Sequence, residues 1–228
     1  MPQDTILSTG KRTQKINKIH KKKLSVSSKN WLRRQMNDPF VAEAKVQGYR
    51  ARSAFKIVEI NNKFKIFKKG KKVLDLGSAP GGWSQVAVKI VGKGNVFATD
   101  ILEMNPISGV KFVQQDFLAP EAPEVLMGAI GGERYDVAIS DLASNTTGNK
   151  RIDHLRTTVL LDEAFDFAIK VLKEDGIFIG KVFQGGAEPE LFTKVNKYFK
   201  TVKHFKPESS RKDSVEMYII AKGFKGVI

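Results

Sequence analysis

The chain of 228 residues has an apolar content of 41%, so it can bury one substantial core and carry a small appendage. It has no cysteine, which excludes disulfides and thiolate metal sites, and its three histidines are too scattered to predict a metal site. No apolar run reaches transmembrane length and the amino terminus lacks the apolar segment of a signal peptide. We therefore expect a cytoplasmic protein with no bound metal and no membrane partner.

The formal net charge is +15, from 39 basic and 24 acidic residues, and the basic residues are clustered. Residues 1–30 carry eight basic side chains against one acid, and six lysines lie between positions 63 and 72. Because each phosphate neutralised on a polyanion releases counterions, such clusters favour nucleic acid as the partner. The alternative is a lysine-rich surface that is merely solvated.

The amino-terminal third predicts an arm followed by helices. Residues 1–26 lack apolar periodicity and are expected to form a disordered basic arm. The pair Asp38-Pro39 is typical of a helix start, and that helix should stop near Gly48. The apolar residues between 54 and 60 suit a helix that lies on a sheet. We expect one domain over 27–228, in which 27–70 form a helical extension facing nucleic acid.

From Lys72 onward, short apolar runs alternate with helical stretches. Because only a short stretch, PESSRKD, joins the last two predicted strands, these two strands should be antiparallel. The pattern predicts an α/β fold with a mixed, mainly parallel sheet of seven strands flanked by helices. The predicted strands are 72–76, 95–99, 111–114, 135–140, 176–183, 201–206 and 215–222. The predicted helices are 82–90, 121–129, 155–173 and 188–199.

The stretch VLDLGSAPGGW, Val73 to Trp83, has the order of strand, glycine turn and helix that holds nucleoside-bearing cofactors at the carboxyl end of a sheet. Gly77 and Gly81 allow a positive φ and a close approach to a ligand. The spacing is not G-x-G-x-x-G, and Pro80 lacks the N–H that a pyrophosphate needs. We therefore predict a nucleoside site without a phosphate requirement, which disfavours the rival hypothesis of an NAD-dependent oxidoreductase.

Three further residues are candidates for contact with the cofactor. Asp100 ends the second strand, 23 positions after Gly77, where an acid accepts hydrogen bonds from ribose hydroxyls. Asp116, after the third strand, is placed to reach a bound base. Trp83 opens the helix after the turn, where it packs either on the ligand or in the core.

Four more residues fall on separate elements that a mixed sheet can bring to one cleft. Asp141 follows the fourth strand, and Glu216 lies among apolar neighbours in the last strand. Lys56 belongs to the helix before the first strand but not to its apolar face. Lys181 interrupts an apolar strand, where an amine is costly unless it reaches a partner or an open cleft. A lysine at a sheet edge that extends to solvent is the alternative for Lys181.

Taken together, these stretches resemble the FtsJ-type ribosomal RNA large-subunit 2′-O-methyltransferases. The similarity runs in family order from about Ser27 to Gly223. The combination of DLGxAPGGW with a separate acid, KVFQG and a late glutamate is specific. The matching stretches are SSKNWL, RARSAFKIVEI, VLDLGSAPGGWSQ, SDLASNTTG, IFIGKVFQGG and KPESSRKDSVEMYIIAKG.

The resemblance implies a class I, Rossmann-like methyltransferase fold that uses S-adenosyl-L-methionine. Ser144 departs from the family, which has proline in the D-M-A-P-N stretch where this chain has DLASN. The matching motifs imply that the family's catalytic residues correspond here to Lys56, Asp141, Lys181 and Glu216. The cofactor-binding residues are Gly81, Trp83, Asp100, Asp116 and Asp141.

The implied reaction is methylation of a ribose 2′-hydroxyl, of a uridine, in large-subunit (23S-type) ribosomal RNA late in subunit assembly. Lys181 would act on the 2′-oxygen as base or as charge stabiliser, Asp141 would orient it, and Lys56 and Glu216 would position the ribose. We expect a monomer whose partner is the large ribosomal subunit, with RNA lying across the cleft mouth on residues 27–70 and the basic arm. A 2′-O-methyltransferase of transfer RNA or of an mRNA cap, and a non-catalytic RNA-binding or ribosome-assembly protein, are the alternatives.

Overall fold

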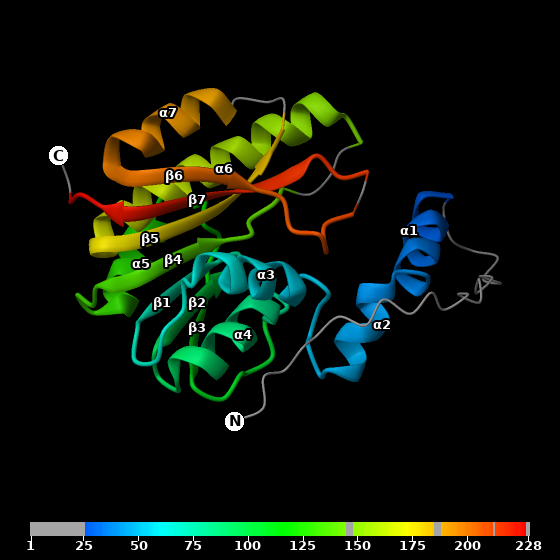
Figure 1. Cartoon of the computed structure of the whole chain (residues 1–228), viewed down its shortest axis with the longest axis horizontal. Helices are drawn as coiled ribbons and strands as arrows, with labels where there is room; N and C mark the ends of the chain where they lie inside the picture. The colour runs from blue at the N-terminus through cyan, green and yellow to red at the C-terminus, as the bar shows by residue number, and fades with distance from the viewer. Residues whose placement is uncertain (1–25, 145–147, 185–187, 212, 227–228) are drawn as a thin grey trace.

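The computed structural model describes residues 26–144, 148–184, 188–211 and 213–226. Apart from Val26, the predicted basic arm lies outside these residues. The described part forms a seven-stranded sheet with the strand order β3-β2-β1-β4-β5-β7-β6, which lies between two layers of helices (Figure 1). The strands are β1 (Val73–Leu76), β2 (Val96–Asp100), β3 (Val110–Gln114), β4 (Tyr135–Ser140), β5 (Leu172–Phe183), β6 (Phe199–Phe205) and β7 (Glu216–Phe224).

The central strand β1 is parallel to β2 and to β4, whereas β7 is antiparallel to both β5 and β6. The predicted mixed sheet of seven strands is therefore confirmed. In this register Leu76 at the end of β1 has Thr99 on one side and Ser140 on the other. The strand ends consequently form one row, called here the carboxyl edge, and the strand beginnings form the opposite amino edge. Because β7 is antiparallel, its first residue lies at the carboxyl edge and its last residues lie at the amino edge.

Each face of the sheet has its own hydrophobic core. One face is covered by α3 (Ala54–Phe64) and α4 (Gly82–Val91). The other is covered by α5 (Ala122–Ile130), α6 (Lys150–Val171) and α7 (Glu188–Tyr198). The side chains of Ala54, Ile57 and Ile60 are completely buried, as expected for a helix that lies on the sheet.

Two short helices precede this sandwich, α1 (Val26–Met36) and α2 (Pro39–Val46). In Figure 1 they extend beyond the end of the sheet at which β7 begins, which is the carboxyl edge. Asp38 caps α2 as predicted, because its Oδ1 accepts a hydrogen bond of 3.1 Å from the N–H of Phe40. The helical extension is thereby placed on the side of the sheet at which α/β folds bind ligands.

The boundary between α6 and β5 differs from the prediction. The helix begins at Lys150 and ends at Val171, whereas β5 already begins at Leu172. Leu172 pairs with Tyr135, and the register then shifts before Val137 pairs with Ile177. Periodicity along one segment cannot reveal this extension, because it depends on pairing with a strand from elsewhere in the chain.

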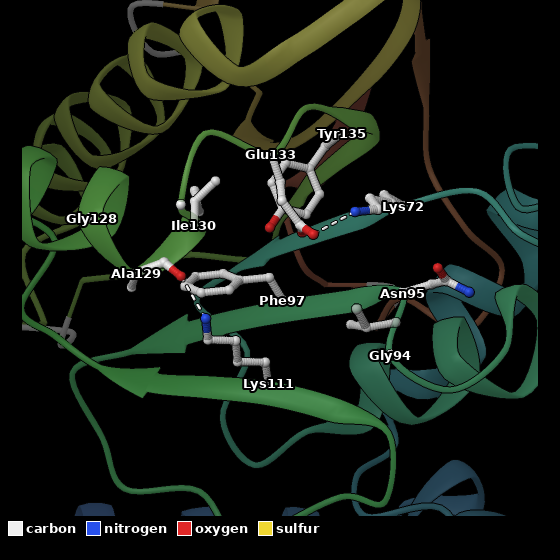
Figure 2. A pocket seen from close by; sticks show the side chains of 12 residues that line it. Lys72, Gly94, Asn95, Phe97, Lys111, Gly128, Ala129, Ile130, Glu133 and Tyr135 are labelled. Atoms are coloured by element: carbon white, nitrogen blue, oxygen red, sulfur yellow. Dashed lines mark hydrogen bonds and ion pairs between the residues drawn. The ribbon is translucent and has the colours of Figure 1, made fainter.

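A cavity of about 360 Å³ lies at the amino edge, between the beginnings of β2 and β3 and the end of α5 (Figure 2). Lys72 and Lys111 line it together with Phe97 and Tyr135. None of the helices in the described ranges is long and apolar enough to cross a membrane.

Candidate active site at the carboxyl edge

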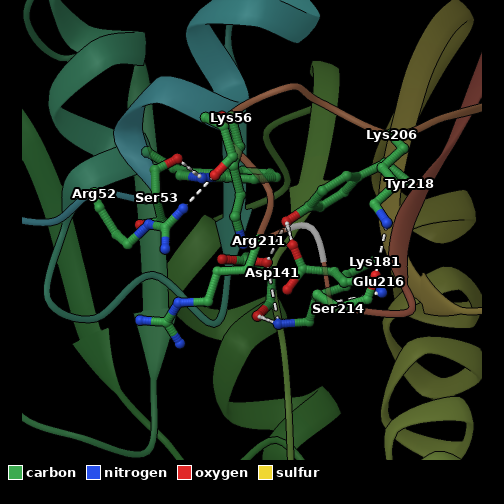
Figure 3. Close-up of polar contacts among 12 residues, drawn as sticks. Arg52, Ser53, Lys56, Asp141, Lys181, Lys206, Arg211, Ser214, Glu216 and Tyr218 are labelled. Carbon is green, nitrogen blue, oxygen red and sulfur yellow. Dashed lines mark hydrogen bonds and ion pairs between the residues drawn. The ribbon is translucent and has the colours of Figure 1, made fainter. Parts of the chain in front are cut away.

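The four residues predicted to act in catalysis converge at the carboxyl edge (Figure 3). Asp141 directly follows β4, and Lys181 lies two residues before the carboxyl end of β5. The Nζ of Lys181 lies 3.1 Å from Oδ1 of Asp141 and donates a hydrogen bond of 2.7 Å to the carbonyl oxygen of the same residue. Lys56, in the first turn of α3, forms an ion pair with Glu216 at the start of β7.

Tyr218 connects the two ion pairs and was not predicted as a site residue. Its hydroxyl lies 2.9 Å from Oδ1 of Asp141 and 3.1 Å from Oε1 of Glu216, and its single proton can be donated to one of them at a time. Alternate residues of a strand point to the same face. The spacing of two between Glu216 and Tyr218 was therefore a signal available in the sequence.

The charged side chains of this cluster are largely buried, and their positive and negative charges compensate one another. Lys181 is only 6% exposed. Burial acts to raise the pKa of Asp141, but the charges of Lys181 and Lys56 and the hydrogen bonds that Asp141 accepts outweigh it and hold that pKa below its ordinary value. Burial, followed by the nearby carboxylates of Asp141 and Glu216, raises the pKa of Tyr218 well above its ordinary value. Tyr218 therefore remains a hydrogen-bond donor across the physiological pH range.

A second polar network fixes the loop between β6 and β7 beside this cluster. Arg52 forms an ion pair with Asp38 and donates a hydrogen bond to the carbonyl oxygen of Ser209. The Nε of Arg211, in the same loop, lies 3.4 Å from Oδ2 of Asp38. Glu59 on α3 accepts hydrogen bonds from two backbone N–H groups of the loop, at 2.6 and 2.9 Å. Three segments far apart in the sequence thus hold two arginines beside the polar cluster around Asp141.

The glycine turn after β1 is closely packed. Gly81, the N-cap of α4, has φ = 103°, and a Cβ on it would lie 2.7 Å from Ile107 and 2.9 Å from the sulfur of Met104. A side chain at this position is therefore excluded both by backbone conformation and by space. Asp100 fixes the turn, because its Oδ2 accepts a hydrogen bond of 2.8 Å from the N–H of Ala79.

Several buried polar groups along this edge have no partner among the described residues. They include the hydroxyls of Ser78, Thr99 and Ser140 and Oδ1 of Asp75. Burial raises the pKa of Asp75 to about 7, and the negative charges of Asp141 and Asp100 add to this effect. Unpaired buried polar groups are costly, so their concentration in one place indicates a ligand. The hydroxyl, amino and sulfonium groups of S-adenosylmethionine offer suitable hydrogen-bond partners and a compensating positive charge, so these residues fit that cofactor.

The remaining predicted cofactor residues lie in different environments. Trp83 is 2% exposed and packs in the core under Tyr218, with ring centroids 5.4 Å apart, while its indole N–H donates to the carbonyl oxygen of Ser53. Asp116 is exposed beyond β3, where its Oδ1 accepts a hydrogen bond of 3.0 Å from the N–H of Leu118. Their contacts with a cofactor stay predictions.

Two other features bear on the predicted RNA surface. The hydroxyl of Ser144, which replaces the family proline, lies 3.4 Å from the hydroxyl of Thr157 on α6. The lysines of 65–72 do not lie at the cleft mouth, because they precede β1 and so lie at the amino edge, whereas the glycine turn follows β1. Residues 65–70 of the expected RNA-facing extension therefore lie away from the cleft mouth, and contact of the extension with RNA stays a prediction.

The model of the FtsJ-like methyltransferase family matches residues 49–224, most of the described chain. The chain belongs to this family. It is 50% identical over 219 residues to a protein of Rickettsia rickettsii named ribosomal RNA large subunit methyltransferase E, covering 93% of this chain and 96% of the relative. The protein of the same name from Rickettsia felis is 49% identical over the same length. A crystal structure of a Plasmodium falciparum protein named as a ribosomal RNA methyltransferase superposes with a TM-score of 0.69 at 30% identity, covering 78% of this chain and 100% of the other.

The family assignment confirms the resemblance and the methyltransferase fold predicted from the motifs. The matched region contains the glycine turn, the polar network around Asp141 and the loop between β6 and β7. No group of three or more possible metal ligands lies among the residues that the structure describes.

Proposed function

We propose that the protein transfers a methyl group from S-adenosylmethionine to the 2′-hydroxyl of a uridine ribose in large-subunit ribosomal RNA, late in subunit assembly. The observation that carries this proposal is the position of the Lys181 amine, which Asp141 holds through two contacts at the carboxyl edge. The names of the relatives that match nearly the whole chain support ribosomal RNA as the substrate.

The chemistry requires help mainly at the nucleophile. The cofactor supplies a methyl group that its sulfonium makes electrophilic. A ribose hydroxyl is a poor nucleophile, so it must be aligned with that methyl group and must lose its proton during attack. Alignment supplies several kcal/mol, and a positioned base typically contributes about 10²–10⁴-fold.

Lys181 is the group best placed to act on the 2′-oxygen. An ammonium has three N–H donors, and the carboxylate and the carbonyl oxygen of Asp141 account for two of them. The third direction is left for the ribose. As an amine, Lys181 would accept the hydroxyl proton there; as an ammonium, it would donate to the developing alkoxide. Replacement by arginine, which keeps the charge but cannot act as a base, distinguishes these two roles.

The other residues of the cluster hold Lys181 and the ribose in place. Asp141 orients the amine and offsets positive charge at the methyl donor. Lys56 and Glu216 form an ion pair next to the Tyr218 hydroxyl, where they would position the ribose hydroxyls. Tyr218 holds both carboxylates in one arrangement. The cluster would therefore be pre-organised before RNA binds.

The RNA backbone would be held beside this cluster by basic groups of the extension and of the loop between β6 and β7. Arg52 and Arg211 both contact Asp38, which partly neutralises them in the free protein. Guanidinium groups bind phosphate in a forked geometry, so a phosphate next to the target ribose could replace Asp38 as their partner. Phosphate contacts of this kind would make RNA binding steeply dependent on salt.

The test is transfer of a tritiated methyl group from S-adenosylmethionine to large ribosomal subunits that lack the modification. A 2′-O-methyl group blocks cleavage at its own linkage, so alkaline hydrolysis should leave the label in a resistant dinucleotide. Label in base-modified mononucleotides would contradict ribose methylation. Methyl transfer to transfer RNA or to capped RNA, but not to subunits, would show that one of those RNAs is the substrate instead of ribosomal RNA. Cofactor binding without transfer to any of these RNAs would favour a non-catalytic role.

A further inference from the structure

The amino edge of the sheet is strongly basic, although it faces away from the candidate active site. Seven segments meet there: 65–72, 92–95, 109–111, 131–136, 170–176, 197–200 and 222–226. They carry four acidic residues, Glu133, Asp136, Glu174 and Asp175. Their fourteen basic residues are Lys65, Lys68, Lys69, Lys71, Lys72, Lys93, Lys111, Arg134, Lys170, Lys173, Lys197, Lys200, Lys222 and Lys225.

The acids of this edge are already paired with some of these lysines. Asp136 accepts hydrogen bonds from Lys71 at 2.8 Å and from Lys173 at 3.1 Å. Glu133 pairs with Lys72 at 2.5 Å beside the cavity (Figure 2). Asp175 pairs with Lys200 at 2.6 Å. Since most of the negative charge is used in this way, the other lysines keep their charge uncompensated.

Three exposed lysines stand close together at the half of this edge formed by β1, β2 and β3. Within the part of the chain that the structure describes, Lys68, Lys69 and Lys93 form no ion pair. The N–H of Gly70 donates a hydrogen bond of 2.9 Å to the carbonyl oxygen of Val91, so the segment of Lys68 and Lys69 lies beside that of Lys93. The N–H of Gly94 donates one of 2.8 Å to the carbonyl oxygen of Gly109, which places the segment of Lys111 next to them. The fold therefore gathers lysines that are about 24 positions apart in the sequence onto one small surface.

We propose that this surface binds the phosphate backbone of a second RNA segment, separate from the segment that reaches the candidate active site. The proposal rests on the proposed function in one respect, because only a large folded RNA presents two segments to opposite edges of the protein. β1 alone separates the edges by about 13 Å at 3.3 Å per residue. Backbone contacts at the amino edge would carry no sequence information, but would fix the orientation of the enzyme on the particle.

An anionic membrane surface is the other polyanion to consider. The amino edge lacks the exposed apolar side chains that membrane binding requires in addition to basic residues. A membrane-binding surface combines basic residues with exposed apolar side chains that insert between lipids. The large exposed apolar side chains among the described residues, such as Ile101, Leu102 and Leu155, all lie outside the seven segments of this edge. The charge pattern without apolar anchors favours RNA.

The experiment compares two triple variants that lose the same charge. The edge variant is Lys68→Gln, Lys69→Gln and Lys93→Gln, and the control is Lys89→Gln, Lys194→Gln and Lys203→Gln, which lie on α4, α7 and β6 outside the seven segments. Binding of each is measured against salt concentration, with unmodified large subunits and with a single-stranded RNA of about ten nucleotides, a length within the usual range of one binding site. Thermal unfolding verifies that both variants are folded.

We expect the edge variant alone to lose affinity for the subunit, on the order of tenfold, with a salt slope lower by about 2 to 3, since each lost phosphate contact lowers it by about one. Its affinity for the short RNA and its transfer rate at saturating subunit should match those of the control. Equal losses in both variants, or an equal loss on the short RNA, would overturn the second site and indicate only a general effect of charge. If the edge variant lost binding to phosphatidylglycerol vesicles but kept its RNA binding, the partner of the amino edge would be a lipid surface and not RNA.

These readouts separate the second site from the proposed function. They measure binding, so a protein that transfers no methyl group to subunits could still lose subunit affinity through the edge variant. Conversely, normal transfer by a protein whose edge variant binds subunits unchanged would leave the proposed function intact and refute the second site.

Discussion

The two edges of the sheet are built from the same strands, but the segments that connect those strands differ in charge, and their buried polar groups differ in how many have hydrogen-bond partners. The described loops at the carboxyl edge, 77–81, 100–108, 115–121, 141–144, 205–211 and 213–216, contain eight acidic residues and two basic ones. The amino-edge segments contain four acidic and fourteen basic residues. A cationic cofactor suits the first edge and a polyanion suits the second.

The same contrast holds for individual acids. Asp75 at the carboxyl edge keeps one oxygen without a partner and its pKa is raised to about 7, with burial as the main cause. Asp136 at the amino edge accepts three hydrogen bonds from lysine and backbone donors, which outweigh burial and lower its pKa. One edge therefore retains an electrostatic cost that a ligand can relieve, whereas the other uses its acids to stabilise the fold. The following substitutions compare matched residues at the two edges.

The largest expected difference in methyl transfer is between substitutions of two lysines, one at each edge. Lys181→Met should lower methyl transfer by about 10²–10⁴-fold, because it removes the group that acts on the 2′-oxygen. Lys111→Met, which removes a hydrogen bond of 2.6 Å to the carbonyl oxygen of Ala129 at the amino edge, should leave the rate at saturating substrate unchanged. Single-turnover transfer with cofactor binding measured in parallel checks both. Near-normal turnover of Lys181→Met with intact cofactor binding would remove Lys181 from the mechanism.

The raised pKa of Asp75 should appear as a pH-dependent loss of stability. The folded protein holds this proton more tightly than the unfolded chain, so the free energy of unfolding falls as the pH rises from about 4 to about 7. Integrated over that window, the loss amounts to as much as about 4 kcal/mol. Asp75→Asn should therefore be more stable than the wild type at pH 8 and similar to it near pH 4, in urea unfolding without cofactor. A difference that does not vary with pH would show that Asp75 is ionised throughout.

Asp136 should behave in the opposite way. Its lowered pKa contributes stability that is present above the unfolded pKa and is lost as the pH falls through the folded pKa. We expect Asp136→Asn to destabilise the protein by about 2 kcal/mol at pH 7, because hydrogen bonds to a charged acceptor are lost. The deficit should shrink toward pH 3, and methyl transfer should be unaffected. A deficit that grows on acidification would contradict the sign of the shift.

Much of the fold could be predicted because its signals are local. All seven strands were found from short apolar runs, and the start of α2 was found from Asp38 and Pro39. The end of α6 and the start of β5 could not be found, because Leu172 becomes strand only by pairing with Tyr135. Local patterns fix which element forms, whereas its limits depend on partners elsewhere in the chain.

The candidate site was predictable because each of its residues belongs to a motif at a strand end or, for Lys56, at a helix start. The structure brings Lys56, Asp141, Lys181 and Glu216 together, and their roles remain predictions. Proximity in sequence misled in one case, since lysines just before β1 and the glycine turn just after it lie at opposite edges. The contacts of Asp38 with Arg52 and Arg211 join three separate segments, so no spacing in the sequence reveals them.

The two buried tyrosines give the smallest and most specific comparison. Tyr218→Phe removes only the hydroxyl that lies between Asp141 and Glu216 and keeps the packing on Trp83. We expect a stability loss of about 1 kcal/mol, typical of one hydrogen bond, and a decrease in transfer of about tenfold, since 1.4 kcal/mol corresponds to that factor. Tyr135, at the amino edge, is likewise buried and its pKa is likewise raised by burial. Tyr135→Phe should leave transfer unchanged in the same single-turnover assay. If both variants lost transfer equally, general packing rather than the arrangement of the two carboxylates would account for the effect of Tyr218.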